Sequence, residues 1–191
     1  MKVKISESLR YIGADKNDAE MKKKTKKLMA VILPQINPSK VCTRFTVVKT
    51  DDGYALGSTG VVLKGNLIKK TLERADDVFL FAATLGLESE RLIKNCFACD
   101  SLSGVICDGI LTAAIVQFCD GIENEIKLKA KKEGKSTKPR ISCGYGDFDL
   151  RRQGDILRLL NAEKLLGIKL NDSFMMYPNK TVTAIIAAGN L

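Results

Sequence analysis

Histidine and tryptophan are absent from the 191-residue sequence, which also has only four prolines and four tyrosines. Without an imidazole the chain can form neither a Ser-His triad nor a histidine general base. Phosphate-binding fingerprints are missing as well: there is no G-x-G-x-x-G after a strand and no complete G-x-x-x-x-G-K-S/T loop. These absences exclude the commonest hydrolase and nucleotide-binding arrangements.

Long apolar runs are also missing. No stretch of about 18 apolar residues occurs, as a membrane span would need. The first residues are polar and lack the apolar core of a secretory signal. We therefore expect a cytoplasmic protein without membrane contact. With 45% hydrophobic residues, the chain is long enough to bury one substantial core.

The six cysteines lie mostly inside apolar segments, and in a chain without an export signal we expect reduced, buried thiols. Cys96-x-x-Cys99 is compatible with half a metal site or a redox pair. A zinc ribbon needs a second C-x-x-C, which the chain does not have, and no histidine can replace it. Core cysteine is the favoured interpretation, and we predict no metal site.

Positive charge dominates, with a formal net charge of +9. Five lysines lie within residues 22–27, and six more lie within residues 127–138. Such blocks are typical of a solvated helix face, and they also suit an acidic protein partner or nucleic acid. The aromatic residues do not alternate with the basic runs, as a base-stacking platform would require. We expect an acidic partner and no nucleic acid.

Hydrophobic spacing predicts helices alternating with short strands. The predicted helices cover residues 5–11, 17–33, 66–75, 87–97, 100–132 and 150–166. The predicted strands cover residues 40–49, 60–63 and 78–83, with a final hairpin of 173–177 and 181–187 turned at Pro178-Asn179. We expect one α+β domain, 1–191, with a mainly antiparallel twisted sheet flanked by helices. An N-terminal helical segment, 1–38, precedes the core, 40–191.

The predicted helix 100–132 carries a polar stripe on an otherwise apolar surface. Asp108, Thr112, Val116 and Asp120 are spaced four apart and therefore share one face. Buried polar groups need hydrogen-bond partners. The stripe is explained either by local and water-mediated bonds or by contact with a ligand.

The segment that begins at Arg140 places a permanent cation beside Gly144, Tyr145 and Gly146. Arginine offers a rigid fork of donors for a carboxylate, glycine lets the main chain approach a ligand, and tyrosine stacks. This combination suits a small, charged, flat molecule, but an arginine before a glycine-rich turn is also a common loop anchor. Asp147 and Asp149 form either a carboxylate pair or the exit of the turn.

Several spaced elements together give a specific resemblance. They are R-x-x-x-G-Y-G-D from Arg140, LL-x-x-E-K-x-x-G-I-x-L with Glu163 and Gly167, S-F-M-M-Y-P before a run of alternating residues, the apolar residues 78–86, and residues 9–13 near the start. The chain resembles the activation domain of cobalamin-dependent methionine synthase, the S-adenosylmethionine-binding reactivation module, in a free-standing version. The resemblance implies the activation-domain fold.

The resemblance also implies a ligand site. Arg140 would pair with the methionyl carboxylate, and Tyr145 would lie near the sulfonium, with Gly144 between them. An acidic ligand contact of the family falls at Val116 or its neighbour Gln117, and this chain has no carboxylate at either position. Gln117 can hydrogen-bond a ligand hydroxyl or amine without the charge attraction. The proline that the family usually has before the first glycine is Cys143 here.

The function implied is that of an accessory domain in reductive methylation, the reactivation of cobalamin. Its partners would be cobalamin-carrying methionine synthase modules or another corrinoid protein, and an acidic flavodoxin-type electron donor. The chain would act in trans as part of a methyltransferase system, contributing ligand positioning and no catalytic residue of its own. The alternative is a non-catalytic adaptor that docks on a corrinoid protein and has lost S-adenosylmethionine.

Overall fold

The computed structural model describes residues 3–191, and the chain divides into two compact units. The first, here called the helical unit, comprises the described residues up to Ser39, Ala83–Asp120 and Tyr177–Thr181. The second, the sheet unit, comprises Lys40–Ala82, Gly121–Met176 and Val182–Leu191. Each unit is therefore assembled from segments that are distant in the sequence.

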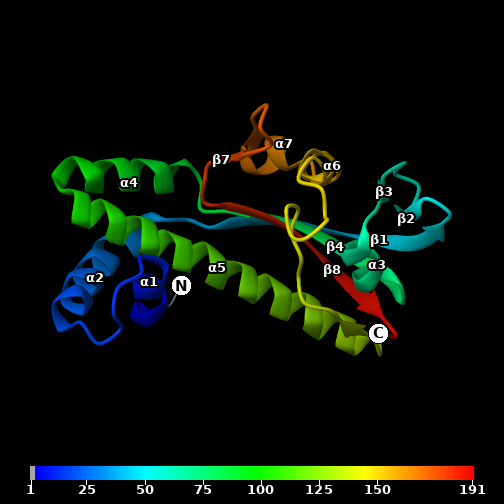
Figure 1. The fold of residues 1–191 in the computed structure, drawn as a ribbon, viewed down its shortest axis with the longest axis horizontal. Coiled ribbons are helices and arrows are strands. Elements are labelled where there is room, and N and C mark those ends of the chain that lie inside the picture. The colour runs from blue at the N-terminus through cyan, green and yellow to red at the C-terminus, as the bar shows by residue number, and fades with distance from the viewer. Residues whose placement is uncertain (1–2) are drawn as a thin grey trace. The chain divides into compact units, whose positions relative to one another are not determined.

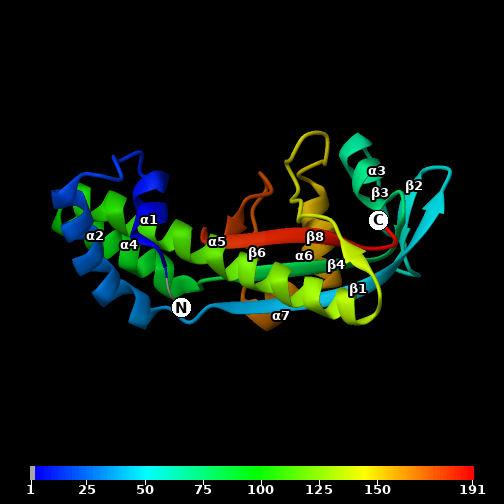
Figure 2. The same ribbon diagram turned by 90° about the horizontal axis from the view of Figure 1, so that it is seen from below.

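The helical unit is built from α1 (Ile5–Tyr11), α2 (Ala19–Ile32), α4 (Leu87–Cys99) and the beginning of α5 (Ser101–Lys132). Figure 2 shows α1, α2 and α4 grouped around the first turns of α5. The Asp18 side chain accepts a hydrogen bond from the Met21 amide at 2.9 Å and so caps α2. The helix passes into the short 3₁₀ turn η1 (Leu33–Gln35), where Pro34 cannot donate to a continuing helix.

The α5 helix is the one described helix that is long and apolar enough to cross a membrane by length and composition. More than half of its most apolar window, 56%, is buried inside the protein. Leu111 and Ala114 have no exposed surface, and neither has Ile110. A helix that is buried in this way is the core helix of a soluble fold.

The sheet unit contains most of a six-stranded sheet with the order β3-β2-β1-β4-β8-β5. Its strands are β1 (Ser39–Thr50), β2 (Gly53–Leu56), β3 (Val62–Leu63), β4 (Ala75–Thr84), β5 (Ser136–Thr137) and β8 (Thr181–Gly189). The pairs β1–β2, β2–β3 and β5–β8 are antiparallel. The structure confirms the predicted α+β class with a mainly antiparallel sheet and flanking helices (Figure 1).

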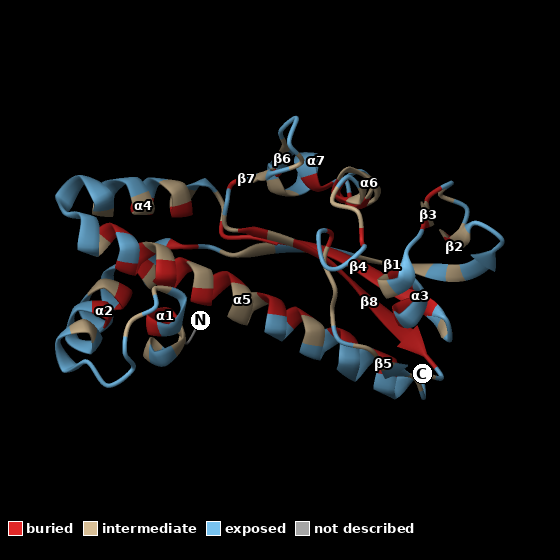
Figure 3. Ribbon diagram, in the orientation of Figure 1, coloured by how far each residue is buried: buried red, intermediate tan, exposed pale blue. Residues whose placement is uncertain are grey.

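The central strands β4 and β8 are buried along nearly their whole length, as Figure 3 shows. In the sheet unit their apolar side chains join one cluster with α3 (Asn66–Leu72), α6 (Arg152–Leu159) and α7 (Ala162–Leu166). Phe148, which follows the glycine-rich turn, is 1% exposed and belongs to the same cluster. Burying each large side chain of this kind stabilises the fold by about 1.5–3 kcal/mol.

The predicted hairpin of 173–177 with 181–187 is wrong. The strand β7 (Met176–Tyr177) pairs with β6 (Lys169–Leu170) in a separate two-stranded sheet, whereas β8 belongs to the large sheet. Asn171 causes this pairing, because its side chain accepts from the amides of Ser173 and Met175 at 3.0 and 2.9 Å. The tight turn therefore lies before β7, not at Pro178-Asn179.

The predicted helix 150–166 is two helices, α6 and α7. Asn161 separates them with a φ of 50°, a left-handed conformation that interrupts an α-helix and that asparagine tolerates better than most residues. The strand β2, which was not predicted, pairs with β1 through Gly53, where φ is 146°. A Cβ at Gly53 would lie 2.4 Å from the Leu63 carbonyl oxygen, so the close approach of β3 requires glycine.

Candidate ligand-binding site

The glycine-rich turn at residues 144–148 is a tight, anchored loop in the sheet unit. Gly144 and Gly146 have φ values of 87° and 55°, which few other residues adopt without strain. The amide of Gly144 donates to the Phe148 carbonyl at 2.7 Å, and the Phe148 amide donates to the Tyr145 carbonyl at 2.9 Å. The buried Phe148 ring fixes one end of the turn in the core.

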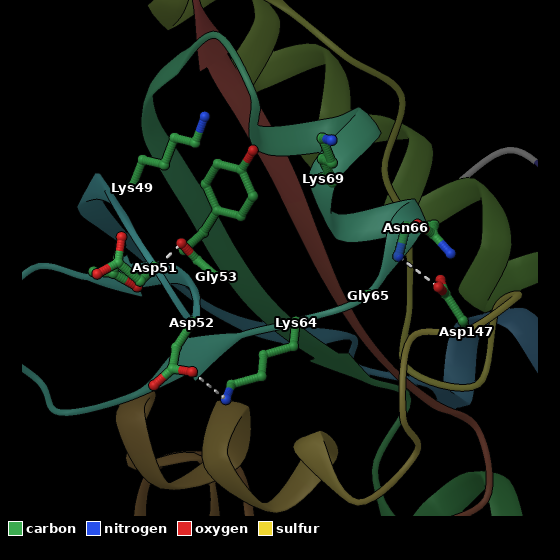
Figure 4. Close-up of a pocket in the computed structure, with 11 residues that line it drawn as sticks. Lys49, Asp51, Asp52, Gly53, Lys64, Gly65, Asn66, Lys69 and Asp147 are labelled. Atoms are coloured by element: carbon green, nitrogen blue, oxygen red, sulfur yellow. Dashed lines mark hydrogen bonds and ion pairs between the residues drawn. The ribbon is translucent and has the colours of Figure 1, made fainter.

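Asp147 fixes the other end of the turn by capping α3. Its carboxylate accepts hydrogen bonds from the backbone amides of Leu67 at 2.9 Å and Asn66 at 2.5 Å, and Figure 4 shows the contact with Asn66. These amide donors, Leu67 first, lower the pKa of Asp147. Asp149 is occupied by Arg151, which lowers its pKa through a side-chain hydrogen bond. The two carboxylates serve the turn exit and do not form a pair with each other.

Arg140 is paired with Glu123 of α5. The guanidinium donates to one Glu123 oxygen at 2.6 Å, and the Arg140 backbone amide donates to the other at 3.3 Å. Both side chains are partly buried, with 23% and 26% of their surface exposed. The predicted carboxylate-binding arginine is therefore already engaged with an internal carboxylate. Sequence reasoning missed Glu123, although it lies three residues beyond Asp120 of the polar stripe.

Tyr145 is exposed to solvent, whereas Cys143 is buried. The Tyr145 side chain is 58% exposed, so its ring is accessible beside the turn. Cys143 is buried in the core of the sheet unit, and desolvation raises its pKa to about 12. The thiol is thus neutral and packs where the related motif has proline.

Val116 and Gln117 line a cavity of about 190 Å³ in the helical unit. The cavity is also lined by Val3, Lys4, Glu7, Tyr11, Ala113 and Asp120. The Gln117 Oε1 atom is buried and has no hydrogen-bond partner among the described residues. An unsatisfied buried acceptor of this kind favours a ligand that donates a hydrogen bond there. The contribution of α1 to this cavity was not predicted.

The first half of the polar stripe has a local explanation. The Lys180 ammonium lies 2.7 Å from an Asp108 oxygen and donates to the Thr112 hydroxyl at 2.8 Å. Because these groups are satisfied within the helical unit, they need no ligand. The structure thus brings Arg140, Gly144 and Tyr145 together in one unit, and Val116 and Gln117 together in the other.

Of three comparisons with known proteins, the one with solved structures found a match to the fold. No family model matches the sequence, and no curated protein matches it. A solved structure of the MetH reactivation domain bound to AdoHcy shares the fold, with a TM-score of 0.69 and 18% sequence identity. The match covers 93% of this chain and 68% of that one. The chain therefore has the fold of a methionine synthase reactivation domain, as its sequence motifs predicted.

Proposed function

We propose that this chain is an S-adenosylmethionine-binding accessory domain that supports reductive methylation of cobalamin on a partner protein. The observation that carries the proposal is the anchored turn from Arg140 to Asp147 on a reactivation-domain fold. The solved relative is bound to AdoHcy, which is S-adenosylmethionine without its transferable methyl group. A ligand of the same shape is the simplest occupant for the turn.

In this proposal the chain positions the ligand and supplies no acid or base. Arg140 binds the methionyl carboxylate, Gly144 lets the main chain approach, and Tyr145 presents its ring face to the sulfonium. Within the helical unit, the unpartnered oxygen of Gln117 offers an acceptor to an amine or hydroxyl group of a ligand. The sulfonium is already an activated methyl donor, and cobalamin carried by the partner supplies the nucleophile.

The basic surface supports docking to acidic partners in the cytoplasm. All five lysines of the block in α2 have exposed side chains, and the charge of the whole chain is +9. We propose that this face receives a flavodoxin-type electron donor, and that a methionine synthase module or another corrinoid protein binds in trans. Charge complementarity of this kind accelerates association and weakens with added salt.

A second candidate function is a non-catalytic adaptor that docks on a corrinoid protein. Two observations favour it: no carboxylate stands at Val116 or Gln117, and Glu123 already occupies Arg140. A charge-assisted hydrogen bond contributes about 1.5–3 kcal/mol, so loss of the acidic contact weakens ligand binding substantially. The adaptor needs the fold and the surface but not the ligand.

Calorimetric titration with S-adenosylmethionine separates the two functions. We expect the natural chain to bind, Arg140→Ala to lose binding, and the exposed-site control Arg158→Ala to retain it. Tyr145→Ala, whose exposed ring contributes little to folding, tests the turn without disturbing the Glu123 pair. A gain of affinity in Val116→Glu would show that the helix meets the ligand.

The remaining outcomes decide against the methyl donor. If the natural chain gives no binding heat but Val116→Glu binds S-adenosylmethionine, the pocket is still present and the adaptor function is supported. The absence of binding heat in the natural chain and in every variant would refute S-adenosylmethionine binding. Thermal unfolding of Arg140→Ala, compared with Arg158→Ala, distinguishes a lost ligand contact from a lost fold.

A further inference from the structure

A second pocket, in the sheet unit, has a chemistry unrelated to the methyl donor. It has a volume of about 410 Å³ and is lined by the β1–β2 turn and the start of α3. Figure 4 shows its lining residues, which are Lys49, Thr50, Asp51, Asp52, Gly53, Tyr54, Lys64, Gly65, Asn66, Lys69 and Asp147. The lining is therefore rich in charged side chains.

The carboxylates and ammonium groups of this pocket are not equally engaged. Asp52 pairs with Lys64 at 3.5 Å, and Asp147 is bound by the amides of α3. The Lys49 and Lys69 side chains form no hydrogen bond or ion pair with any described residue, and both are exposed to solvent. Figure 4 shows Asp51, in the hairpin turn, on the opposite side of the pocket from Lys69 of α3. Two ammonium groups without an ion pair among the described residues thus line the same pocket as the Asp51 carboxylate.

Tyr54 adds an unsatisfied donor at the same place. It is the cross-strand partner of Lys49, so the two side chains lie on one face of the hairpin. The Tyr54 ring packs in the core and is 5% exposed, yet its hydroxyl has no hydrogen-bond partner among the described residues. A buried hydroxyl without a partner is unfavourable unless a ligand completes it.

We propose that Lys49, Lys69 and the Tyr54 hydroxyl form a binding site for a phosphate group. All three are hydrogen-bond donors, two of them carry positive charge, and a phosphate offers several acceptor oxygens to them at once. The long lysine stems can move to admit an oxyanion to the hydroxyl. The site uses side chains from β1, β2 and α3 and needs no glycine-rich phosphate loop. Its three donors are not among the residues proposed to bind S-adenosylmethionine.

The test is a calorimetric titration with inorganic phosphate, pyrophosphate and ADP, each as a separate probe. Binding of pyrophosphate should weaken at least about tenfold in the double variant Lys49→Ala/Lys69→Ala. The control Lys22→Ala/Lys23→Ala changes the net charge equally and should bind as the natural chain does. Tighter binding of ADP than of pyrophosphate would identify a nucleotide as the source of the phosphate, and equal binding a free phosphate compound.

The variant Tyr54→Phe distinguishes binding at this site from nonspecific attraction of pyrophosphate to the positive charge of the protein. It removes the hydroxyl and retains the ring, so it should weaken pyrophosphate binding without lowering the melting temperature. The proposal is overturned if pyrophosphate does not bind at millimolar concentration, or if the Lys22/Lys23 control loses as much affinity as the Lys49/Lys69 variant. Unchanged binding in Tyr54→Phe would remove the hydroxyl from the site.

Discussion

Two charged clusters in the sheet unit differ in how their charges are satisfied. In the first, here called the paired cluster, Asp77 accepts from Arg44 and from Lys135 at 2.6 Å, and Glu133 binds Arg44 at 2.7 Å. The Asp77 side chain is only 6% exposed. The hydrogen bond from Arg44 lowers the pKa of Asp77; burial opposes this shift, and the hydrogen bond from Lys135 adds to it. Every charge in this cluster has a partner within the protein.

The side chains of the second, the open cluster of Lys49, Tyr54 and Lys69, have no such partners among residues 3–191. The Lys49 and Lys69 side chains are exposed, whereas Asp77 is buried, so the Tyr54 hydroxyl is the buried group of the open cluster that has no partner among the described residues. Charges that are satisfied internally stabilise the fold, whereas donors left unsatisfied on a pocket wall indicate a ligand. The following experiments test that distinction.

Asp77→Asn should produce the largest effect, because it leaves Arg44 and Lys135 without their shared carboxylate. We expect the free energy of unfolding to fall by about 2–3 kcal/mol, measured by urea denaturation. Asp172→Asn, at an exposed position without an ion pair, is the matched control and should change little. Equal stability of the two variants would contradict the role assigned to the paired cluster.

Asp147→Ala should have the next largest effect. Loss of the cap leaves the first amides of α3 without their acceptor, and we expect a melting temperature lower by about 3 °C. Asp147→Asn retains an acceptor oxygen and should recover part of the loss. A melting temperature unchanged in Asp147→Ala would mean that the turn is not anchored through this carboxylate.

Tyr54→Phe should change stability in the opposite direction. Since the hydroxyl is buried without a partner, its removal should raise the free energy of unfolding by about 0.5 kcal/mol in the absence of ligand. Denaturation with and without pyrophosphate measures both effects, because ligand binding stabilises only the folded state. Destabilisation without ligand would show that the hydroxyl has a partner in solution.

The smallest effect concerns pH. The pKa of Asp77 is lowered from 3.8, so its contribution to stability is complete above that pH and is lost as the pH falls below it. The natural chain should therefore lose stability on acidification more steeply than Asp77→Asn. Urea midpoints at pH 6, 4 and 3 would check this difference, with the Asp147 and Asp149 carboxylates contributing equally to both proteins. Parallel pH profiles would contradict it.

The sequence predicted most elements because their signals are local. Apolar spacing placed α2, α4 and α5 to within about two residues, and β-branched and aromatic residues placed β4. The prediction of the C-terminal hairpin was wrong because the position of the turn depends on Asn171. Its side chain accepts hydrogen bonds from two backbone amides that precede β7. The break at Asn161 was not predicted, because the regular spacing of apolar residues continues through it and does not reveal a left-handed backbone conformation.

Some residues of the candidate site could likewise be predicted from the sequence, and others could not. Arg140, Gly144 and Tyr145 follow from a contiguous motif, and the structure places them on one anchored turn. Glu123 lies 17 residues before Arg140, and no local pattern connects the two. The open cluster could not be predicted from the sequence either, because its residues come from β1, β2 and α3, which come together only in the folded protein.

The Arg140–Glu123 pair gives the turn its own counterion. In the proposed function, an incoming carboxylate would have to take over donors that Glu123 now uses, so ligand binding would be an exchange of one anion for another. Glu123 would remain beside Arg140 after the exchange, partly buried and without this hydrogen bond, so its desolvation would oppose ligand binding. The pair would also favour one class of ligand under this proposal: a sulfonium compound without a carboxylate could not replace Glu123 at Arg140.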